Sequence, residues 1–387
     1  MMITDQSSSP MQFLSNARIV LHDRVLHGTA VMQYGRIIDI NTDGHSHREG
    51  VDLDGDYLAP GFVEIHTDNL ERHLMPRPGT HWPALPALIA HDAEIAAAGI
   101  TTVFDAIGVG DTDLEGLRGQ SPDQLLSAFA TARRRGVLRA DHRLHIRCEV
   151  PAPNMWALFA PFASERTVGL LSLMDHTPGQ RQWMSIDPAR RYYTGKKGWT
   201  NERFNQALAD APQLQARYAQ PNRERVVTHA RTNGVVLASH DDTLPEHVKE
   251  ARDAGARISE FPTTVVAAEE ARVHGMSIVM GAPNVVRGGS HSGNVSAIEL
   301  AQLGLLDVLS SDYVPAGLLH AAMRLTRDAG FGMPAAIATI SRNPAKAVGL
   351  CDRGSIQPGM QADLVRLAVI DDQPIVRTVW RSGERIS

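Results

Sequence analysis

Six side chains of the types that bind divalent metals follow short apolar segments in the central part of the chain. They are His66, Asp68, Glu149, His176, His240 and Asp312. Imidazole and carboxylate groups ligate zinc, manganese and iron alike, and six such groups suffice for two ions when one carboxylate bridges them. A water molecule shared by two such ions is acidic enough to attack as hydroxide near neutral pH. The six residues therefore predict a hydrolytic centre with one or two divalent ions, with Zn²⁺ favoured over Mn²⁺ and Fe²⁺.

Each of these residues also has a purely structural interpretation when it is taken alone. In the segment His66-Thr67-Asp68, the two-residue period of a strand places His66 and Asp68 on one face, but such a pair is weak evidence for a metal site. Asp312 is as well suited to cap the following helix as to accept a proton. Only the joint pattern is specific. Within it we expect Asp312 to be catalytic, orienting the attacking water and taking its proton.

The elements that must position these residues alternate between apolar strands and helices. The expected strands are Phe62–His66, Thr101–Ile107, Leu144–Val150, Val168–Met174, Val235–Ser239, Arg257–Phe261, Ser277–Gly281 and Val308–Ser311. The expected helices between them include Ala84–Ala98, Pro122–Arg135, Asn201–Tyr218, Leu244–Ala254 and Ala316–Ala329. Eight buried strands alternating with helices predict an α/β fold, a (β/α)8 TIM-like barrel, whose active site lies at the carboxyl ends of the strands.

Both ends of the chain have a different texture, with short β segments separated by turns. These segments are Ala17–Leu21, Gly28–Gln33, Arg36–Ile40 and Val51–Leu53 near the start, and Asp363–Leu367 and Pro374–Arg381 near the end. We expect the two ends to pair into a small β-sandwich domain. The predicted organisation is residues 1–60 and 350–387 for the β-sandwich and 61–349 for the barrel.

Composition narrows the possible functions. With 387 residues, 43% of them hydrophobic and 21% charged, the chain has an ordinary globular composition, and its net charge of −5 gives no support for nucleic-acid binding. The two cysteines, Cys148 and Cys351, fit neither a disulfide framework nor a thiolate zinc site. We find no signal peptide and no membrane span, and we expect a cytoplasmic protein without membrane partners.

The chain contains 17 histidines, and most of them are expected to be incidental. Eight lie among polar or turn-forming neighbours and are predicted to be plain surface residues: His22, His27, His45, His47, His91, His142, His247 and His274.

At the six candidate ligands the chain resembles the amidohydrolase superfamily, which combines a metal-bearing (β/α)8 barrel with a β-sandwich built from both chain ends. Within it, longer segments resemble the M-protein family of the carbon-phosphorus lyase pathway. These segments are His66-Thr-Asp-Asn-Leu-Glu-Arg-His73 with Pro76-Arg-Pro-Gly79, Tyr192-Tyr-Thr-Gly-Lys-Lys197, Ala238-Ser-His-Asp-Asp242, Met280-Gly-Ala-Pro-Asn-Val-Val-Arg-Gly-Gly-Ser-His-Ser-Gly-Asn294 and Ser310-Ser-Asp-Tyr313. Many amidohydrolases carry His-x-His on the first strand and a carboxylated Lys as bridge. Here Asp68 replaces the second His, and Glu149 would take the bridging place.

This resemblance implies hydrolysis of α-D-ribose 1-methylphosphonate 5-triphosphate to the 5-phosphate and diphosphate, in phosphonate catabolism. Such a substrate carries several negative charges, so a chain with net charge −5 needs local donors to bind it. The donors expected near the rim are Arg72, His73, Arg77, Tyr192, Tyr193, Lys196, Lys197, Arg287, Ser290 and His291. Lys196 and Lys197 fit a solvated surface pair equally well, and Gly288-Gly289 fits a flexible turn.

Several alternatives stay open at this stage. Attack at the α-phosphorus releases diphosphate, whereas attack at the γ-phosphorus releases orthophosphate, and the residues alone do not decide between them. A second hypothesis is an amidohydrolase that cleaves a C–N bond in a cyclic amide or N-acyl substrate, which needs few basic residues near the rim. A third hypothesis is a catalytically silent scaffold subunit. Under this hypothesis some of the metal-binding positions should carry side chains that cannot bind a metal. Barrels with exposed apolar helices commonly dimerise, so a homodimer is considered, although no single stripe identifies an interface.

Overall fold

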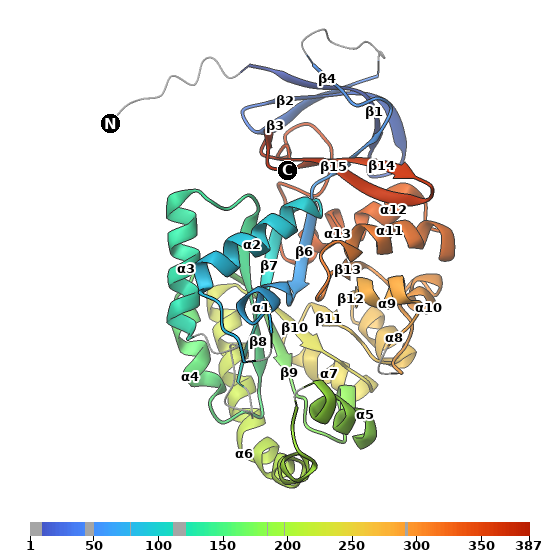
Figure 1. Ribbon diagram of the computed structural model, residues 1–387. Helices are drawn as coiled ribbons and strands as arrows, with labels where there is room; N and C mark the ends of the chain where they lie inside the picture. The colour runs from blue at the N-terminus through green and yellow to red at the C-terminus, as the bar shows by residue number, and fades with distance from the viewer. Residues whose placement is uncertain are drawn as a thin grey trace.

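The protein combines a parallel β-barrel covered by helices with a second sheet built from both chain ends (Figure 1). The computed structural model describes residues 10–42, 50–77, 79–110, 121–183, 185–196, 198–290 and 293–387. Among the described residues, no helix is both long enough and apolar enough to cross a membrane.

The barrel strands follow one another in chain order, and all their hydrogen-bonded neighbours are parallel. They are β6 (Phe62–Thr67), β7 (Ile100–Val109), β8 (Asp141–Glu149), β9 (Val168–Met174), β10 (Val236–His240), β11 (Ile258–Glu260), β12 (Ser277–Gly281) and β13 (Val308–Ser310). A parallel bridge between Thr67 and Asp312 brings the first strand beside the last. The eight predicted strands and the TIM-like fold are confirmed.

The interior of the barrel is filled by side chains from almost every strand. One apolar cluster includes Val63, Phe104, Leu170, Ala238, Ile258, Val279 and Val308. Alternation along each strand turns every second side chain inward, so the layer beyond this cluster holds the residues near the carboxyl ends. The apolar layer thus lies directly beneath the candidate ligands inside the barrel.

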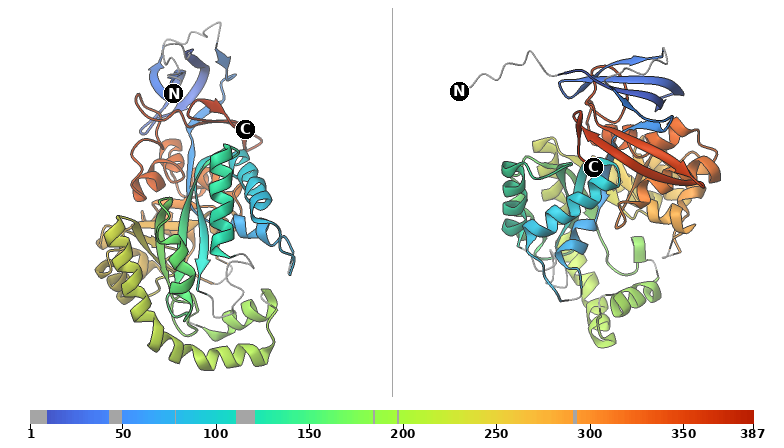
Figure 2. Two further views of the ribbon diagram at one scale, coloured as in Figure 1. Left: turned by 90° about the vertical axis from the view of Figure 1, so that its left-hand side faces the viewer. Right: turned by 45° about the horizontal axis from the view of Figure 1, so that its top comes forward.

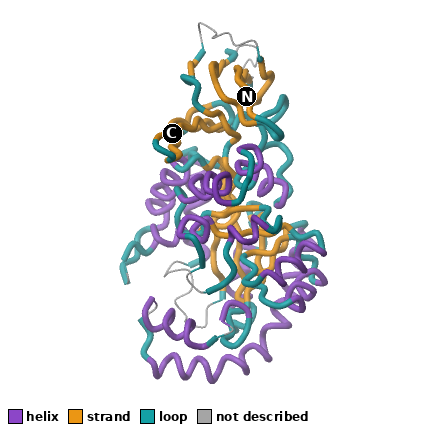
Figure 3. The backbone as a smooth tube through the Cα atoms, turned by 90° about the vertical axis from the view of Figure 1, so that its right-hand side faces the viewer, coloured by secondary structure: helices purple, strands orange, loops and turns teal. Residues whose placement is uncertain are grey.

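Helices cover the outside of the barrel (Figure 3). They are α1 (Asn69–Leu74), α2 (Ala84–Ala97), α3 (Pro122–Arg135), α4 (Met155–Phe159), α5 (Ile186–Arg191), α6 (Asn201–Asn233), α7 (Pro245–Asp253), α8 (Val265–Val273), α9 (Ala282–Arg287), α10 (Ala297–Gln302), α11 (Gly317–Asp328), α12 (Met333–Ala338) and α13 (Arg342–Ala347). Local sequence explains the bounds of α3, because Ser121 and Gln124 form a capping box at its start and Gly136, with φ of +61°, ends it.

Helix α6 is longer than predicted, because it continues past Tyr218 to Asn233. Pro212, which lies within the predicted range, and Pro221 are both inside it, although proline lacks the amide hydrogen that an interior helix position donates. Val226 and Ala230 in its second half are buried against the barrel, and this packing outweighs the helix-breaking tendency of the prolines. Its first half extends beyond the barrel together with α5 (Figure 2).

The second sheet joins the two ends of the chain, as predicted. Its strands are β1 (Gln12–Val20), β2 (Val25–Gln33), β3 (Arg36–Asn41), β4 (Val51–Asp52), β5 (Tyr57–Pro60), β14 (Leu364–Ile370), β15 (Gln373–Arg381) and β16 (Glu384–Arg385). They run in the order β16-β15-β14-β5-β1-β2-β3, with β4 paired to β1. The antiparallel pairing of β5 with β14 links the N-terminal and C-terminal parts. This sheet has its own core, which includes Leu14, Ile19, Leu58 and Trp380.

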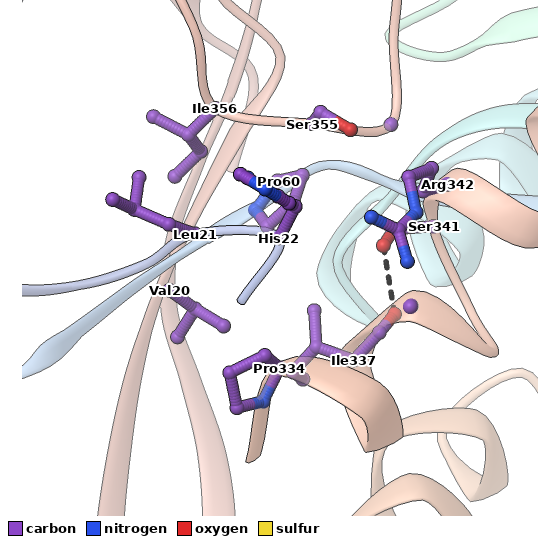
Figure 4. Close-up of a pocket in the computed structure, with 12 residues that line it drawn as sticks. Val20, Leu21, His22, Pro60, Pro334, Ile337, Ser341, Arg342, Ser355 and Ile356 are labelled. Atoms are coloured by element: carbon purple, nitrogen blue, oxygen red, sulfur yellow. Dashed lines mark hydrogen bonds between the residues drawn. The ribbon is translucent and has the colours of Figure 1, made fainter. Parts of the chain in front are cut away.

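A cleft at the seam between this sheet and the barrel lies far from the candidate ligands. It is lined by side chains that include Val20, Pro60, Ile337 and Ile356, and Ser341 donates a hydrogen bond to the carbonyl of Ile337 beside it (Figure 4). Pro60 precedes the first residue of β6, so the cleft is at the amino end of the barrel strands. The candidate ligands stand at the opposite end, and the cleft is therefore a packing feature of the seam.

Candidate metal centre

Two buried histidines at the rim share one buried carboxylate. His66 is the last residue but one of β6, His240 ends β10 and Glu260 ends β11, and all three are buried. The Nδ1 atom of His66 is 3.0 Å from Oε1 of Glu260, and Nδ1 of His240 is 3.3 Å from Oε2. The two imidazole rings are stacked, with centroids 5.6 Å apart. Because Glu260 binds the Nδ1 atoms, the Nε2 atoms are the ones left to bind a metal.

The charges around Glu260 favour its ionised form. Burial alone would raise the pKa of this carboxyl, but the charge of His66 and the hydrogen bonds from His240 and His66 outweigh that effect and hold the pKa well below its ordinary value. Burial lowers the pKa of His145 to about 3, so this imidazole is neutral. Ser172 donates a hydrogen bond to Glu260 at 2.6 Å and completes the set of partners. Glu260 is thus a fixed anion beneath the rim.

Asp68 and Asp312 are joined through the backbone. The amide of Asp68 donates to the carbonyl of Asp312 at 2.6 Å, and the amide of Asp312 donates to the carbonyl of His66 at 3.2 Å. Strand β6 ends at Thr67, so Asp68 is the N-cap residue of α1 and not the strand residue that the two-residue period predicted. The expected neighbourhood nevertheless forms, since Oδ1 of Asp68 lies 3.9 Å from Nε2 of His66.

Arg147 binds both oxygens of Asp68, at 2.7 and 2.9 Å. Burial would raise the pKa of Asp68, but the guanidinium outweighs it and lowers the pKa. Asp68 is therefore ionised and held in one orientation.

His176 and Glu149 form a second part of the centre, on the far side of His240. Glu149 accepts from the backbone amide of His176 at 2.8 Å and from its Nδ1 at 2.5 Å. Nε2 of His176 lies 3.6 Å from Oδ2 of Asp241, and Nε2 of His240 lies 3.4 Å from the same atom. Burial would lower the pKa of His176, but the carboxylates of Glu149 and Asp241 outweigh it and raise the pKa to about 10.

The donor set fits divalent cations. Three overlapping groups bring one donor atom from each member within 4.8 Å of the others: His66 with His240 and Glu260, His176 with His240 and Asp241, and His66 with Asp68 and Asp312. Oδ2 of Asp241 is buried and accepts no regular hydrogen bond among the described residues, and the two Nε2 atoms of His176 and His240 lie 3.6 and 3.4 Å from it. A cation between the two Nε2 atoms and this oxygen would satisfy all three.

Glu260, Asp241 and Arg147 are missing from the predicted set. Glu260 lies within the predicted strand Arg257–Phe261 and Asp241 follows the predicted strand Val235–Ser239, so both stand at carboxyl ends, where the six candidates were also found. The position of Glu260 and Asp241 at the ends of predicted strands could therefore have identified them as candidate site residues. The contact of one carboxylate, Glu260, with both His66 and His240 depends on the tertiary fold. The spacing of these residues in the sequence does not indicate it.

Helix α1 brings two of the predicted substrate-binding residues to the rim. Nη1 of Arg72 donates to the carbonyl of Tyr313 at 2.9 Å, beside Asp312. Nε2 of His73 lies 2.9 Å from Glu94. Arg77 is exposed and forms a bridge with Thr80 just after the helix.

The predicted tyrosines lie in an insertion with its own core. Tyr192 and Tyr193 belong to a π-helical turn, Tyr192–Lys196, and pack against the buried side chains of Trp183, Trp199 and Phe204. The ring centroids of Tyr193 and Trp199 are 4.6 Å apart. Arg181, which forms ion pairs with Asp242 and Glu250, ties the start of the insertion to the rim.

The remaining predicted donors divide into two groups. Arg287 is exposed at the end of α9, and Ser290 is half-buried in the loop after it. Lys197, His291 and the side chain of Lys196 lie outside the described residues.

Of the histidines predicted to be on the surface, His45 and His47 lie outside the described residues, and two of those that the structure describes are buried. His91 on α2 is fully buried and His142 on β8 is 3% exposed. Asp105 on β7 lies between them, with oxygens 2.7 Å from Nε2 of His91 and 2.8 Å from Nδ1 of His142. Their polar sequence neighbours suggested exposure, but these neighbours bond to one another inside the helix–barrel layer.

Comparisons with known proteins show which proteins this chain is similar to. The amidohydrolase family model matches residues 202–386. A curated protein of Escherichia coli (strain K12), alpha-D-ribose 1-methylphosphonate 5-triphosphate diphosphatase, is 45% identical over 375 residues, which cover 96% of this chain and 99% of the relative. The chain belongs to the amidohydrolase family. Within that family it groups with this diphosphatase.

Solved structures of two other hydrolytic enzymes share the fold. N-acetylglucosamine-6-phosphate deacetylase from Pasteurella multocida has a TM-score of 0.64 at 12% identity, over 97% of this chain and 99% of that one. Dihydropyrimidinase from Brevibacillus agri has a TM-score of 0.62 at 14% identity, over 97% and 95%. At such identities the likeness establishes the shared amidohydrolase fold alone.

Proposed function

We propose that the protein hydrolyses α-D-ribose 1-methylphosphonate 5-triphosphate to the 5-phosphate and diphosphate. The observation that carries this proposal is the 45% identity to the E. coli diphosphatase over nearly the full length of both chains. The rim supports it, because a cluster of imidazoles and carboxylates lies beside the guanidinium of Arg72 on α1. The substrate is a small polyanion, and residues 61–349 would form the catalytic barrel.

Seven side chains at the rim would hold one or two divalent ions, and Zn²⁺ is the favoured metal. They are His66, Asp68, Glu149, His176, His240 and Asp312, together with Asp241. When bound, such an ion supplies Lewis acidity, which lowers the pKa of a water molecule and neutralises phosphate charge. Glu260 holds the Nδ1 atoms of His66 and His240, which leaves their Nε2 atoms as the ones that would bind an ion.

Asp312 would orient the attacking water and accept its proton. Its backbone is fixed between β6 and α1 by the two hydrogen bonds to His66 and Asp68, and its φ of +55° is a conformation rare for residues with a side chain. Such a conformation persists at functional sites when the surroundings hold it. The water oxygen bonds to the α-phosphorus, and the bond from the α-phosphorus to the oxygen bridging it to the β-phosphorus breaks.

The leaving diphosphate carries the developing negative charge, and cationic side chains near the rim would stabilise it. Arg72 is placed for this role, because its guanidinium contacts the backbone next to Asp312 while 58% of its side chain is exposed. His73, Arg77 and Arg287 would add to the same positive region.

Hydrolysis in ¹⁸O-labelled water tests the proposed point of attack. Attack at the α-phosphorus places one ¹⁸O atom in the ribose 5-phosphate product and none in diphosphate, which mass spectrometry distinguishes. Labelled diphosphate would show attack at the β-phosphorus, and labelled orthophosphate would show attack at the γ-phosphorus. Either of these results would overturn the proposed mechanism.

A further inference from the structure

A buried polar network connects the core of the helix–barrel layer to the rim. It begins at His142, whose Nδ1 lies 2.8 Å from Asp105 and whose Nε2 lies 3.2 Å from Asp92. The other oxygen of Asp105 lies 2.7 Å from Nε2 of His91. Nδ1 of His91 then lies 3.0 Å from Nδ2 of Asn69, the residue that follows Asp68. None of these side chains belongs to the candidate metal centre.

Three partners determine the orientation of the Asn69 amide. Its nitrogen donates to Glu94 at 3.0 Å and faces His91, and its oxygen accepts from Nη1 of Arg72 at 3.0 Å. Asn69 is fully buried, so these contacts replace all of its hydration. Because an amide nitrogen only donates, Nδ1 of His91 must be the acceptor in this pair.

This orientation excludes a metal between His91, Asp105 and His142, although the three residues are close enough to suggest one. If Nδ1 of neutral His91 accepts from Asn69, its proton resides on Nε2 and is donated to Asp105. Burial also lowers the pKa of His91, which favours the neutral ring. The network is therefore a hydrogen-bonded chain with one direction, in which Arg72 donates to Asn69, Asn69 donates to His91 and His91 donates to Asp105.

We propose that Asn69 and His91 are positioning residues that hold Arg72 for the terminal phosphates of the substrate, an inference that rests on the proposed function. Nη1 of Arg72 is shared between the side chain of Asn69 and the carbonyl of Tyr313, which fixes the guanidinium beside Asp312. His91 in turn keeps the Asn69 amide from rotating. Glu94 also binds His73, so the same amide is linked through Glu94 to the side chain of His73.

A double-mutant cycle between Asn69 and Arg72 tests this proposal. Asn69→Leu keeps the side-chain volume and removes all three polar contacts, and Arg72→Met removes the guanidinium. A hydrogen bond to a charged group contributes about 1.5–3 kcal/mol, so Arg72→Met should raise KM for the triphosphate on the order of tenfold or more. Asn69→Leu should raise KM by a large part of this factor with little change in kcat. The double variant should match Arg72→Met alone, because the function of Asn69 is exerted through Arg72.

Asp92→Asn is the matched control, since Asp92 belongs to the same network but contacts His142 and Arg139 at its other end. It should lower thermal stability and leave KM unchanged. An unchanged KM in Asn69→Leu, or multiplicative effects in the double variant, would overturn the proposal. Circular dichroism and metal content verify each variant, and Asn69→Ser replaces the leucine variant if that protein does not fold. Absence of triphosphate hydrolysis by the unmodified protein would instead refute the proposed function.

Discussion

The Nδ1 atom of His66 lies 3.0 Å from Oε1 of Glu260, although 194 positions separate the two residues in the chain. The same carboxylate lies 3.3 Å from Nδ1 of His240. One anion thus sets the orientation of two imidazoles from different strands, and both present Nε2 to the rim. This arrangement is the basis of the metal centre that we propose.

Replacing Glu260 should weaken metal binding without removing a proposed ligand. We expect Glu260→Gln to lower metal affinity roughly 10- to 100-fold, because partners that orient ligating histidines have effects of that size. Competition with a chromogenic chelator measures the affinity. Glu270→Gln on α8, which removes a carboxylate paired with His274, is the control and should bind metal normally. Equal affinity in both variants would contradict the role given to Glu260.

Asp312→Asn should separate proton transfer from metal binding. The variant loses the group that accepts the proton of water, so kcat should fall roughly 10²- to 10⁴-fold. Metal content, measured by inductively coupled plasma mass spectrometry, should be retained in part because the other ligands stay. Unchanged turnover would rule out Asp312 as the catalytic base.

The charge on His142 should make stability depend on pH. Burial would lower its pKa, but Asp105 and Asp92 outweigh burial and raise the pKa from 6.5 to about 9. A raised pKa in the folded state contributes stability that is fully present below pH 6.5 and is lost as the pH rises through 9. This contribution is about 3 kcal/mol. Urea unfolding at pH 6 and pH 9.5 should show this loss in the unmodified protein and a smaller one in His142→Gln. Equal losses in both would contradict the assignment.

The aromatic insertion provides a test of what Tyr193 does. Its ring packs against Trp199 and Phe204, so we expect the ring to matter more than the hydroxyl. Tyr193→Phe should keep KM within about twofold, whereas Tyr193→Ala should cost roughly 3–5 kcal/mol of local packing and expose the insertion to proteolysis. A marked rise of KM in Tyr193→Phe would show instead that the hydroxyl binds substrate, as the sequence predicted.

The sequence predicted the strands well, because each is a short apolar run bounded by turn residues. Val168–Met174 and Ser277–Gly281 have the predicted bounds. It could not predict where β6 ends, since His66-Thr67-Asp68 fits a continuing strand as well as an N-cap. The local sequence pattern indicates whether a segment is a helix or a strand. Where the element ends also depends on hydrogen bonds to residues that are distant in the chain, and the local pattern does not contain them.

The buried histidines show a second limit. His91 and His142 were predicted to be exposed, yet they are buried because Asp105, Asp92 and Asn69 form hydrogen bonds with them. Hydrogen-bond partners that are far away in the sequence offset the energetic cost of burying these polar side chains. The residues next to each histidine in the sequence do not reveal those partners. The candidate ligands could be recognised from the sequence because each lies at the carboxyl end of a predicted strand, and these strand ends share one rim.

Phosphorus NMR of the metal-loaded protein with α-D-ribose 1-methylphosphonate 5-triphosphate tests the central claim most directly. Our account predicts that diphosphate and the 5-phosphate appear together, that no orthophosphate accumulates, and that a chelator abolishes the reaction. An intact triphosphate, together with hydrolysis of an N-acyl or cyclic amide compound, would contradict the proposed substrate while leaving the amidohydrolase fold in place.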